Sequence, residues 1–116
     1  MADTQKMVAQ IVGIVLTVVG VAGFFVTDSL LGFGVNGAHN VIHLLSGLLG
    51  VGAGFYAAGQ WARDYNKWLG VVYLAVAVLG FFWAGFAGWL NINAADNILH
   101  LVLGVVLAGV GFGVNE

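Results

Sequence analysis

Residues 36–47 read NGAHNVIHLLSG and residues 93–104 read NAADNILHLVLG, and these two stretches decide the fold. Both follow the pattern Asn-x-x-(His/Asp)-Asn-x-x-His, so their polar residues stand at offsets 0, 3, 4 and 7 from the first asparagine. Residues at these offsets share one face of an α-helix. Each stretch is therefore predicted to form a helix with one polar face in an otherwise apolar surrounding.

The likeness between the two stretches extends along the chain at a constant offset of 57 residues, without a gap. The matching pairs are Gly13/Gly70, Gly23/Gly80, Asn36/Asn93, Asn40/Asn97, His43/His100, Gly47/Gly104 and Gly54/Gly111. The polar matches carry most weight, because two apolar segments often match one another by chance. The sequence predicts one membrane domain, residues 1–116, made of repeat 1 (about 7–58) and repeat 2 (about 66–113).

The composition places most side chains in a lipid bilayer. The chain has 116 residues, of which 61% are hydrophobic and 7% are charged, whereas a soluble domain has about 25% charged residues. Four segments reach the length of about 20 apolar residues that a spanning helix needs: 7–26, 38–58, 68–90 and 95–113. Lipid offers no partner for unpaired backbone groups, which favours helices. We expect an all-α membrane protein with four transmembrane helices, formed by tandem duplication of a two-helix hairpin.

The direction of the helices follows from the repeat and from the basic residues. Each repeat holds two spans, so both copies enter the membrane in the same direction, and a parallel pseudo-two-fold axis along the membrane normal is expected. Lys6, Arg63 and Lys67 all fall on one side, whereas the opposite connections carry Asp28 and Asp96. The positive-inside rule predicts a multi-pass protein of the cell membrane with both termini in the cytoplasm.

The chain resembles a bacterial and archaeal family of small four-helix integral membrane proteins that is catalogued as a domain of unknown function. The resemblance rests on residues 34–36, 39–47, 93–101 and the linking stretch 67–73, and it covers nearly the whole chain. It implies the architecture and no established activity.

The first members of each polar motif have a structural explanation. Asn36 and Asn93 are predicted N-caps, and Asp96 stands where a capping-box carboxylate would lie. His39 occupies the position in repeat 1 that Asp96 occupies in repeat 2. We expect these two side chains at the outer rim, where they either pair or, more readily, remain solvated.

The deeper members of the motif lie about 10 Å along each helix, within the hydrocarbon region, and need partners there. One hypothesis is an inter-helix clamp, in which His43 bonds Asn97 and His100 bonds Asn40. We expect the same face to pack closely on another helix at Gly47 and Gly104. A zinc site is a weaker hypothesis, because only His39, His43, Asp96 and His100 are available and zinc prefers three or four ligands in a tetrahedral array. No metal site is therefore expected.

A second hypothesis for these residues is a cofactor. Two imidazoles at equal depth, His43 and His100, are suited to ligate a haem or another tetrapyrrole. A passive pore or transport component is a third possibility, which the lack of ionisable side chains deeper in the spans disfavours. The leading expectation is that no cofactor is bound.

Other function classes are disfavoured by composition. The net charge of −2 provides no basic surface for nucleic acid, and the chain has no cysteine. No serine–histidine or paired-carboxylate arrangement indicates an enzyme. Stripes of small residues suit close helix contacts. We therefore expect a structural or accessory membrane protein, in contact with lipid and present as a homo-oligomer or with other membrane subunits.

Overall fold

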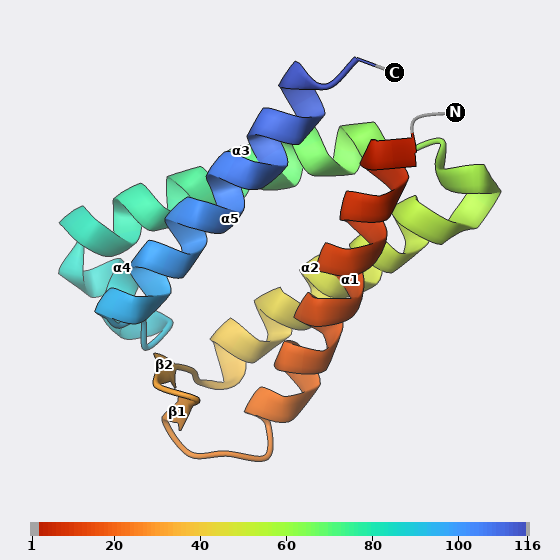
Figure 1. Ribbon diagram of the computed structural model, residues 1–116. Helices are drawn as coiled ribbons and strands as arrows, with labels where there is room; N and C mark the ends of the chain where they lie inside the picture. Colours follow the sequence, from red (N-terminus) through yellow and green to blue (C-terminus); the bar gives the residue numbers. More distant parts are fainter. Residues whose placement is uncertain (1–2, 116) are drawn as a thin grey trace.

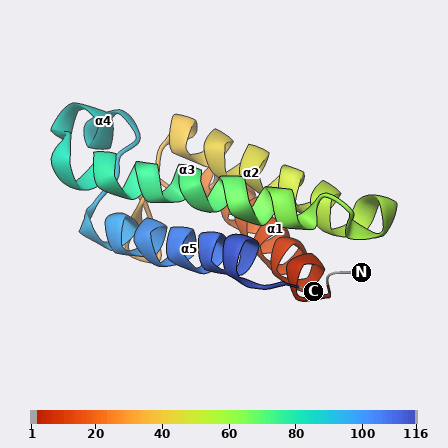
Figure 2. The ribbon, with the colours of Figure 1, turned by 90° about the horizontal axis from the view of Figure 1, so that it is seen from above.

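The computed structural model describes residues 3–115, and four of its helices are long and apolar enough to cross a membrane. These are α1 (Asp3–Gly23), α2 (Gly37–Phe55), α3 (Ala62–Phe82) and α5 (Ala94–Gly113). α2 packs chiefly on α1, and α5 packs chiefly on α3. We call α1 and α2 the first hairpin, and α3 and α5 the second hairpin. The two hairpins diverge from the end that holds both termini (Figure 1). Seen from above, they overlap (Figure 2).

Glycines bring the two helices of each hairpin into backbone contact. A Cβ added at Gly13 would overlap the backbone of Gly50 and Val51, and one added at Gly70 would overlap the backbone of Ala108. Such close approach is the usual role of small residues in membrane helices. Further contacts recur in both hairpins at the 57-residue offset: Gly23 on Asn40 and Gly80 on Asn97, Gly47 on Thr17 and Gly104 on Leu74, Gly54 on Gln10 and Gly111 on Lys67. The predicted close packing at Gly47 and Gly104 is confirmed.

The two outer connections differ from one another. In the first hairpin, β1 (Ser29–Leu30) and β2 (Phe33–Gly34) form a short antiparallel pair. Its two-residue turn has positive φ at Leu31 and Gly32, as a type I′ turn requires. In the second hairpin the connection is the short helix α4 (Ala84–Trp89).

Two predicted span ends are wrong. The first span ends at Gly23 rather than residue 26, because the following residues turn toward β1. The third span ends at Phe82 rather than Leu90, where Trp83 is extended with φ −128° and ψ 98°. Two glycines within α4 weaken helix formation in this segment. Because the chain bends at Trp83, Leu90 turns back toward the bundle and is buried there, at 2% exposed. α2 ends in the 3₁₀ turn η1 (Tyr56–Gly59), which leads to α3.

Polar side chains connect the two hairpins at both ends. At the end that holds both termini (Figure 1), the buried amide of Asn66 donates to the side chain of Gln5 at 2.9 Å, and Gln5 donates to the carbonyl of Val110 at 2.7 Å. Arg63 donates to the last carbonyls of α5, at Gly111 and Val114. A cation is favourable at a helix C-terminus.

At the other end, the side chains of the two N-cap asparagines form hydrogen bonds to the opposite hairpin. The side chain of Asn36 donates to the carbonyl of Trp89 at 2.8 Å, and that of Asn93 donates to the carbonyl of Gly32 at 3.0 Å. Trp89 and Gly32 are themselves 57 residues apart, so the two bonds are equivalent in the repeat. Each N-cap thus ties its own helix to the connection of the other hairpin.

The side chains that face outward are apolar, as a bilayer requires. Exposed examples on each long helix are Val18, Leu49, Trp68 and Val102. Such a surface is in contact with lipid rather than water.

Candidate functional site

Three buried histidines meet between the two hairpins, in the half of the bundle nearer to the β-strands and α4. His39 and His43 belong to α2, and His100 belongs to α5. The three side chains are 2%, 6% and 2% exposed. Their ring centroids lie 4.3 Å (39–43), 5.5 Å (39–100) and 6.1 Å (43–100) apart. We call these three residues the histidine cluster.

The cluster forms because of helical spacing. His39 and His43 are one turn apart on α2, so they stack on the same face. Positions 40 and 43 are three residues apart, which separates them by about 60° around the helix. The histidines therefore face α5, whereas Asn40 faces α1 in its own hairpin.

The predicted clamp is wrong for the same reason. Neither His43–Asn97 nor His100–Asn40 forms a hydrogen bond in the part of the chain that the structure describes. Asn97 instead donates to the carbonyl of Gly80 at 3.3 Å, within the second hairpin. The side chain of Asn40 lies on Gly23, where any Cβ would collide with it.

Four ring nitrogens of the cluster are buried without a hydrogen-bond partner among the described residues. They are both ring nitrogens of His39, and Nδ1 of His43 and of His100. Buried polar atoms are normally paired, because an unsatisfied one costs about 1–3 kcal/mol. One nitrogen from each of the three rings can be chosen so that all three lie within 4.8 Å of one another.

The helix starts beside the cluster agree with the sequence analysis. Asn36 accepts a bond from the backbone N–H of His39 at 2.9 Å. Asn93 and Asp96 form a capping box, in which each side chain accepts from the other residue's backbone N–H at 2.9 Å. The predicted N-caps are thus confirmed.

The expectation of solvated rim residues is wrong. Asp96 is 2% exposed, as is His39. The carboxylate of Asp96 lies close enough to the ring of His39 to interact with it electrostatically, and the carbonyls of Gly34 and Leu90 also approach that ring. Leu90, which is 2% exposed, lines a cavity together with all three histidines and covers this end of the cluster. The sequence offered no direct signal for this cover, because it depends on how α4 folds back.

A tyrosine of α3 completes the polar centre. Tyr73 is 2% exposed, and its ring centroid lies 5.5 Å from that of His100. Its hydroxyl donates to Oγ of Ser46 at 3.3 Å. Tyr65, about two helix turns before Tyr73 on α3, donates to the carbonyl of Ser46 at 2.8 Å. Sequence reasoning missed Tyr73, whose phenol is hidden in an apolar helix.

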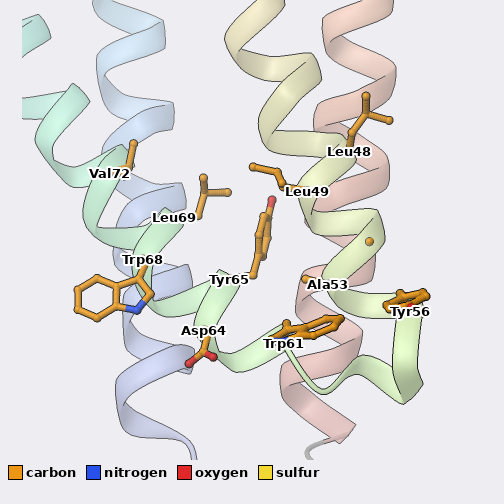
Figure 3. A pocket seen from close by; sticks show the side chains of 11 residues that line it. Leu48, Leu49, Ala53, Tyr56, Trp61, Asp64, Tyr65, Trp68, Leu69 and Val72 are labelled. Carbon is orange, nitrogen blue, oxygen red and sulfur yellow. The ribbon is translucent and has the colours of Figure 1, made fainter.

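A separate groove lies between α2 and α3 at the end near η1 (Figure 3). Its volume is about 570 Å³, and its walls are almost entirely apolar and aromatic. Tyr56 and Trp61 stack there with centroids 5.6 Å apart, and Asp64 is the only charged side chain of the lining. Leu49 and Trp68, which line it, are 66% and 60% exposed. The groove therefore opens to lipid and offers no set of ligand atoms.

The fold and the buried centre define a small multi-pass membrane protein with four candidate spanning helices and a polar centre in one half of the bundle. Residues 6–113 match the family described as a domain of unknown function, DUF4383, and the chain belongs to this family. The family resemblance expected from the sequence is confirmed. No curated protein and no solved structure matches the chain.

Proposed function

We propose that this protein is an accessory membrane protein built around a transition-metal site, in which His39, His43 and His100 are the ligands. The observation that carries the proposal is the histidine cluster itself: three buried imidazoles from both hairpins, with one ring nitrogen of each within 4.8 Å of the other two, and with four ring nitrogens of the cluster buried without a partner among the described residues. Imidazole suits zinc, copper, iron and nickel. A bound ion would satisfy nitrogens that the described residues leave without partners.

The spacing of the nitrogens supports three-fold ligation. Metal–imidazole bonds are about 2.0–2.1 Å long, so a tetrahedral ion holds its ligand nitrogens about 3.4 Å apart. The cluster nitrogens lie within 4.8 Å. Side-chain rotations that move each ring by less than about 1 Å would bring the three nitrogens to that separation, and no helix needs to move.

Asp96 fits the position of an outer-shell partner. Metal-bound imidazoles usually donate their second N–H to a carboxylate or a backbone carbonyl, which fixes the orientation of the ring. His39 has the carboxylate of Asp96 and the carbonyls of Gly34 and Leu90 nearby. The polar residues of the two motifs differ at one position, which is His39 in the first and Asp96 in the second. His39 thereby provides one ligand, and Asp96 provides one negative charge.

The structural consequence is a link between the hairpins. The backbones of α2 and α5 approach each other only weakly, compared with the close contacts inside each hairpin. The histidines span that gap. An ion held by His43 and His100 would join the hairpins in the middle, between the hydrogen bonds at the two ends.

A haem between His43 and His100 is a poorer fit than a single ion. The ring of His39 lies 4.3 Å and 5.5 Å from those two rings, closer than they lie to each other at 6.1 Å. It therefore occupies the space that a macrocycle between them would need. The haem hypothesis requires His39 to move away.

We propose that the two hairpins are duplicated copies related by a pseudo-two-fold axis along the membrane normal, which the equivalent glycine contacts and N-cap bonds support. Both termini are assigned to the cytoplasm of a cell-membrane protein, because Lys6, Arg63 and Lys67 lie toward that end. The cluster then lies in the outer half. The proposed role is non-enzymatic.

We also propose association with a second copy or with other membrane subunits. Gly109 and Gly113 support it, because they are exposed on α5 with nothing within 4 Å of an added Cβ. A passive pore remains the remoter alternative, and liposome flux measurements test it.

The test is the metal content of protein purified in detergent without a histidine tag. We expect close to one zinc or copper ion per chain by mass spectrometry after supplementation. His43→Leu and His100→Leu should each lose most of it. Thermal unfolding should occur at a lower temperature in both variants and in chelator-treated wild type.

Gln10→Leu is the matched control. It removes a half-buried amide that donates to the carbonyl of Gly54 at 2.9 Å inside the first hairpin, away from the cluster. Its metal content should equal that of the wild type. A wild-type protein that takes up neither zinc nor copper, or histidine variants that keep their metal, would overturn the proposal.

A further inference from the structure

Two small cavities lie against the histidine cluster on different sides. The first, which we call the α1–α5 cavity, includes Val19 and Leu103 in its lining, and the second, the α4 cavity, includes Val76 and Phe86. Each has a volume of about 170 Å³, and His43, Tyr73 and His100 line both. The cluster therefore stands between the two cavities.

Both cavities reach from the cluster to the lipid-facing surface. Ile11 and Leu99 line the α1–α5 cavity and are 54% and 43% exposed. Val72 and Trp89 line the α4 cavity and are 51% and 62% exposed. A molecule that enters by either cavity comes from the hydrocarbon layer, so it must be small and uncharged.

The volume sets the size of that molecule. Apolar cavities of about 150 Å³ remain dry and accept xenon or benzene. Apart from the histidines and Tyr73, the linings are aliphatic and aromatic side chains. Water would find few hydrogen-bond partners there, so a hydrolytic water on the metal is disfavoured. A diatomic gas is smaller than either cavity and therefore fits into it.

The charge of the site indicates which ion it holds. Three neutral imidazoles add no charge, and Asp96 is the one acidic side chain that the structure places beside the cluster. A monovalent ion with one carboxylate is neutral overall, whereas a divalent ion leaves an excess charge in a low-dielectric surrounding, where burial is costly. Copper(I) is the monovalent member of the ions that imidazole suits.

We infer that the ion is copper(I) and that it binds a small uncharged diatomic gas, of the class of CO and NO, which arrives through the cavities from the bilayer. This inference rests on the proposed metal site. Binding of CO is simple addition to the open coordination position: one metal–ligand bond forms, none breaks, and the copper keeps its oxidation state. The side chains of the chain provide three ligands, a dry surrounding and two apolar routes.

The experiment uses the full chain in lipid nanodiscs, loaded without oxygen with one equivalent of copper(I) and exposed to CO as the probe. Infrared spectroscopy should show a single C–O stretching band that shifts with ¹³CO and is absent in His100→Leu. Val19→Phe and Val76→Phe, which fill one cavity each, should slow the association of CO by roughly tenfold where that cavity is the route, with copper content unchanged.

Val105→Phe is the control, because Val105 is 56% exposed and lines neither cavity; its CO association rate should equal that of the wild type. Where a phenylalanine variant loses its copper, Val19→Leu or Val76→Leu replaces it as the milder filler. Copper-loaded protein without a CO band overturns the inference and leaves the metal site standing. So does a chain that binds zinc but no copper(I). A CO association rate that is unaffected by filling either cavity overturns the proposed routes.

Discussion

The outer connection of the first hairpin is a two-strand turn, and that of the second hairpin is the helix α4, yet the helix pairs below them make equivalent contacts. Gly13 meets Gly50 and Val51 in one hairpin, and Gly70 meets Ala108 in the other. The glycine contacts inside a hairpin thus recur at equivalent positions in both hairpins, whereas the parts that lie between or above the hairpins differ. Function is expected where the copies differ, because only those positions are free of the shared packing requirement.

The differences gather around the cluster. His39 in one copy replaces Asp96 in the other, which turns two equivalent polar faces into one group of three imidazoles and one carboxylate. α4 covers one side of that group through Leu90. The polar contact at the opposite end is also unequal: Gln5 and Asn66 bond each other, while the residues equivalent to them, Ala62 and Ala9, are fully buried alanines.

The shared glycine contacts should give the largest effect on stability. Gly13→Leu and Gly70→Leu each force a side chain into the backbone of the neighbouring helix, and overpacking of this kind costs about 3 kcal/mol or more. Both variants should show the same loss in denaturant unfolding in detergent micelles. Gly109→Leu, at an open position, is the control and should be nearly neutral. Unequal losses at Gly13 and Gly70 would break the equivalence of the two hairpins.

Asp96→Asn tests the position at which the copies differ. Asparagine keeps an oxygen that can accept the N–H of Asn93, so the helix start is preserved, but the negative charge is lost. Loss of an outer-shell partner typically lowers metal affinity 10–100-fold, and competition with a calibrated chelator should show this change for copper and zinc. Unchanged affinity would remove Asp96 from the site.

Asn66→Ala tests the unequal contact at the end of the bundle that holds both termini. It removes the bond to Gln5 and leaves a buried amide less satisfied, at a cost of about 1–3 kcal/mol. We expect lower unfolding stability by about that amount, with metal content unchanged because the cluster lies in the other half of the bundle. If metal were lost together with stability, the two ends would be coupled rather than independent.

Asn36→Asp and Asn93→Asp should give the smallest effects. Aspartate keeps the capping oxygen but cannot donate to Trp89 or Gly32 in the other hairpin, so about 1 kcal/mol is lost. Asn36→Ala loses the cap as well and should cost about 1 kcal/mol more. Equal thermal unfolding of Asn36→Asp and Asn36→Ala would show that the cap contributes nothing.

The sequence was sufficient to predict the features that depend on local pattern. Apolar length predicted the four spans, and an asparagine at the start of each polar motif predicted the caps at Asn36 and Asn93. The offset of 57 led to the close packing at Gly47 and Gly104. These features require only helix geometry and the solvent.

The site was harder to predict, because it depends on rotation and cover. Residues 40 and 43 share a broad helix face, and a rotation of about 60° decides which of them meets the other hairpin. The burial of His39 depends on α4, which the sequence presents as the continuation of a span. An apolar run of that length carries no mark of where it will fold back.

X-ray absorption at the metal edge tests the central claim most directly. Protein purified without a histidine tag and loaded with one equivalent of copper or zinc should show about three nitrogen ligands at about 2.0–2.1 Å, with the scattering pattern of imidazole rings. His39→Leu should lower the imidazole count to two. A spectrum with only oxygen neighbours, or a chain that retains no metal after desalting, would contradict a metal site made by the three histidines.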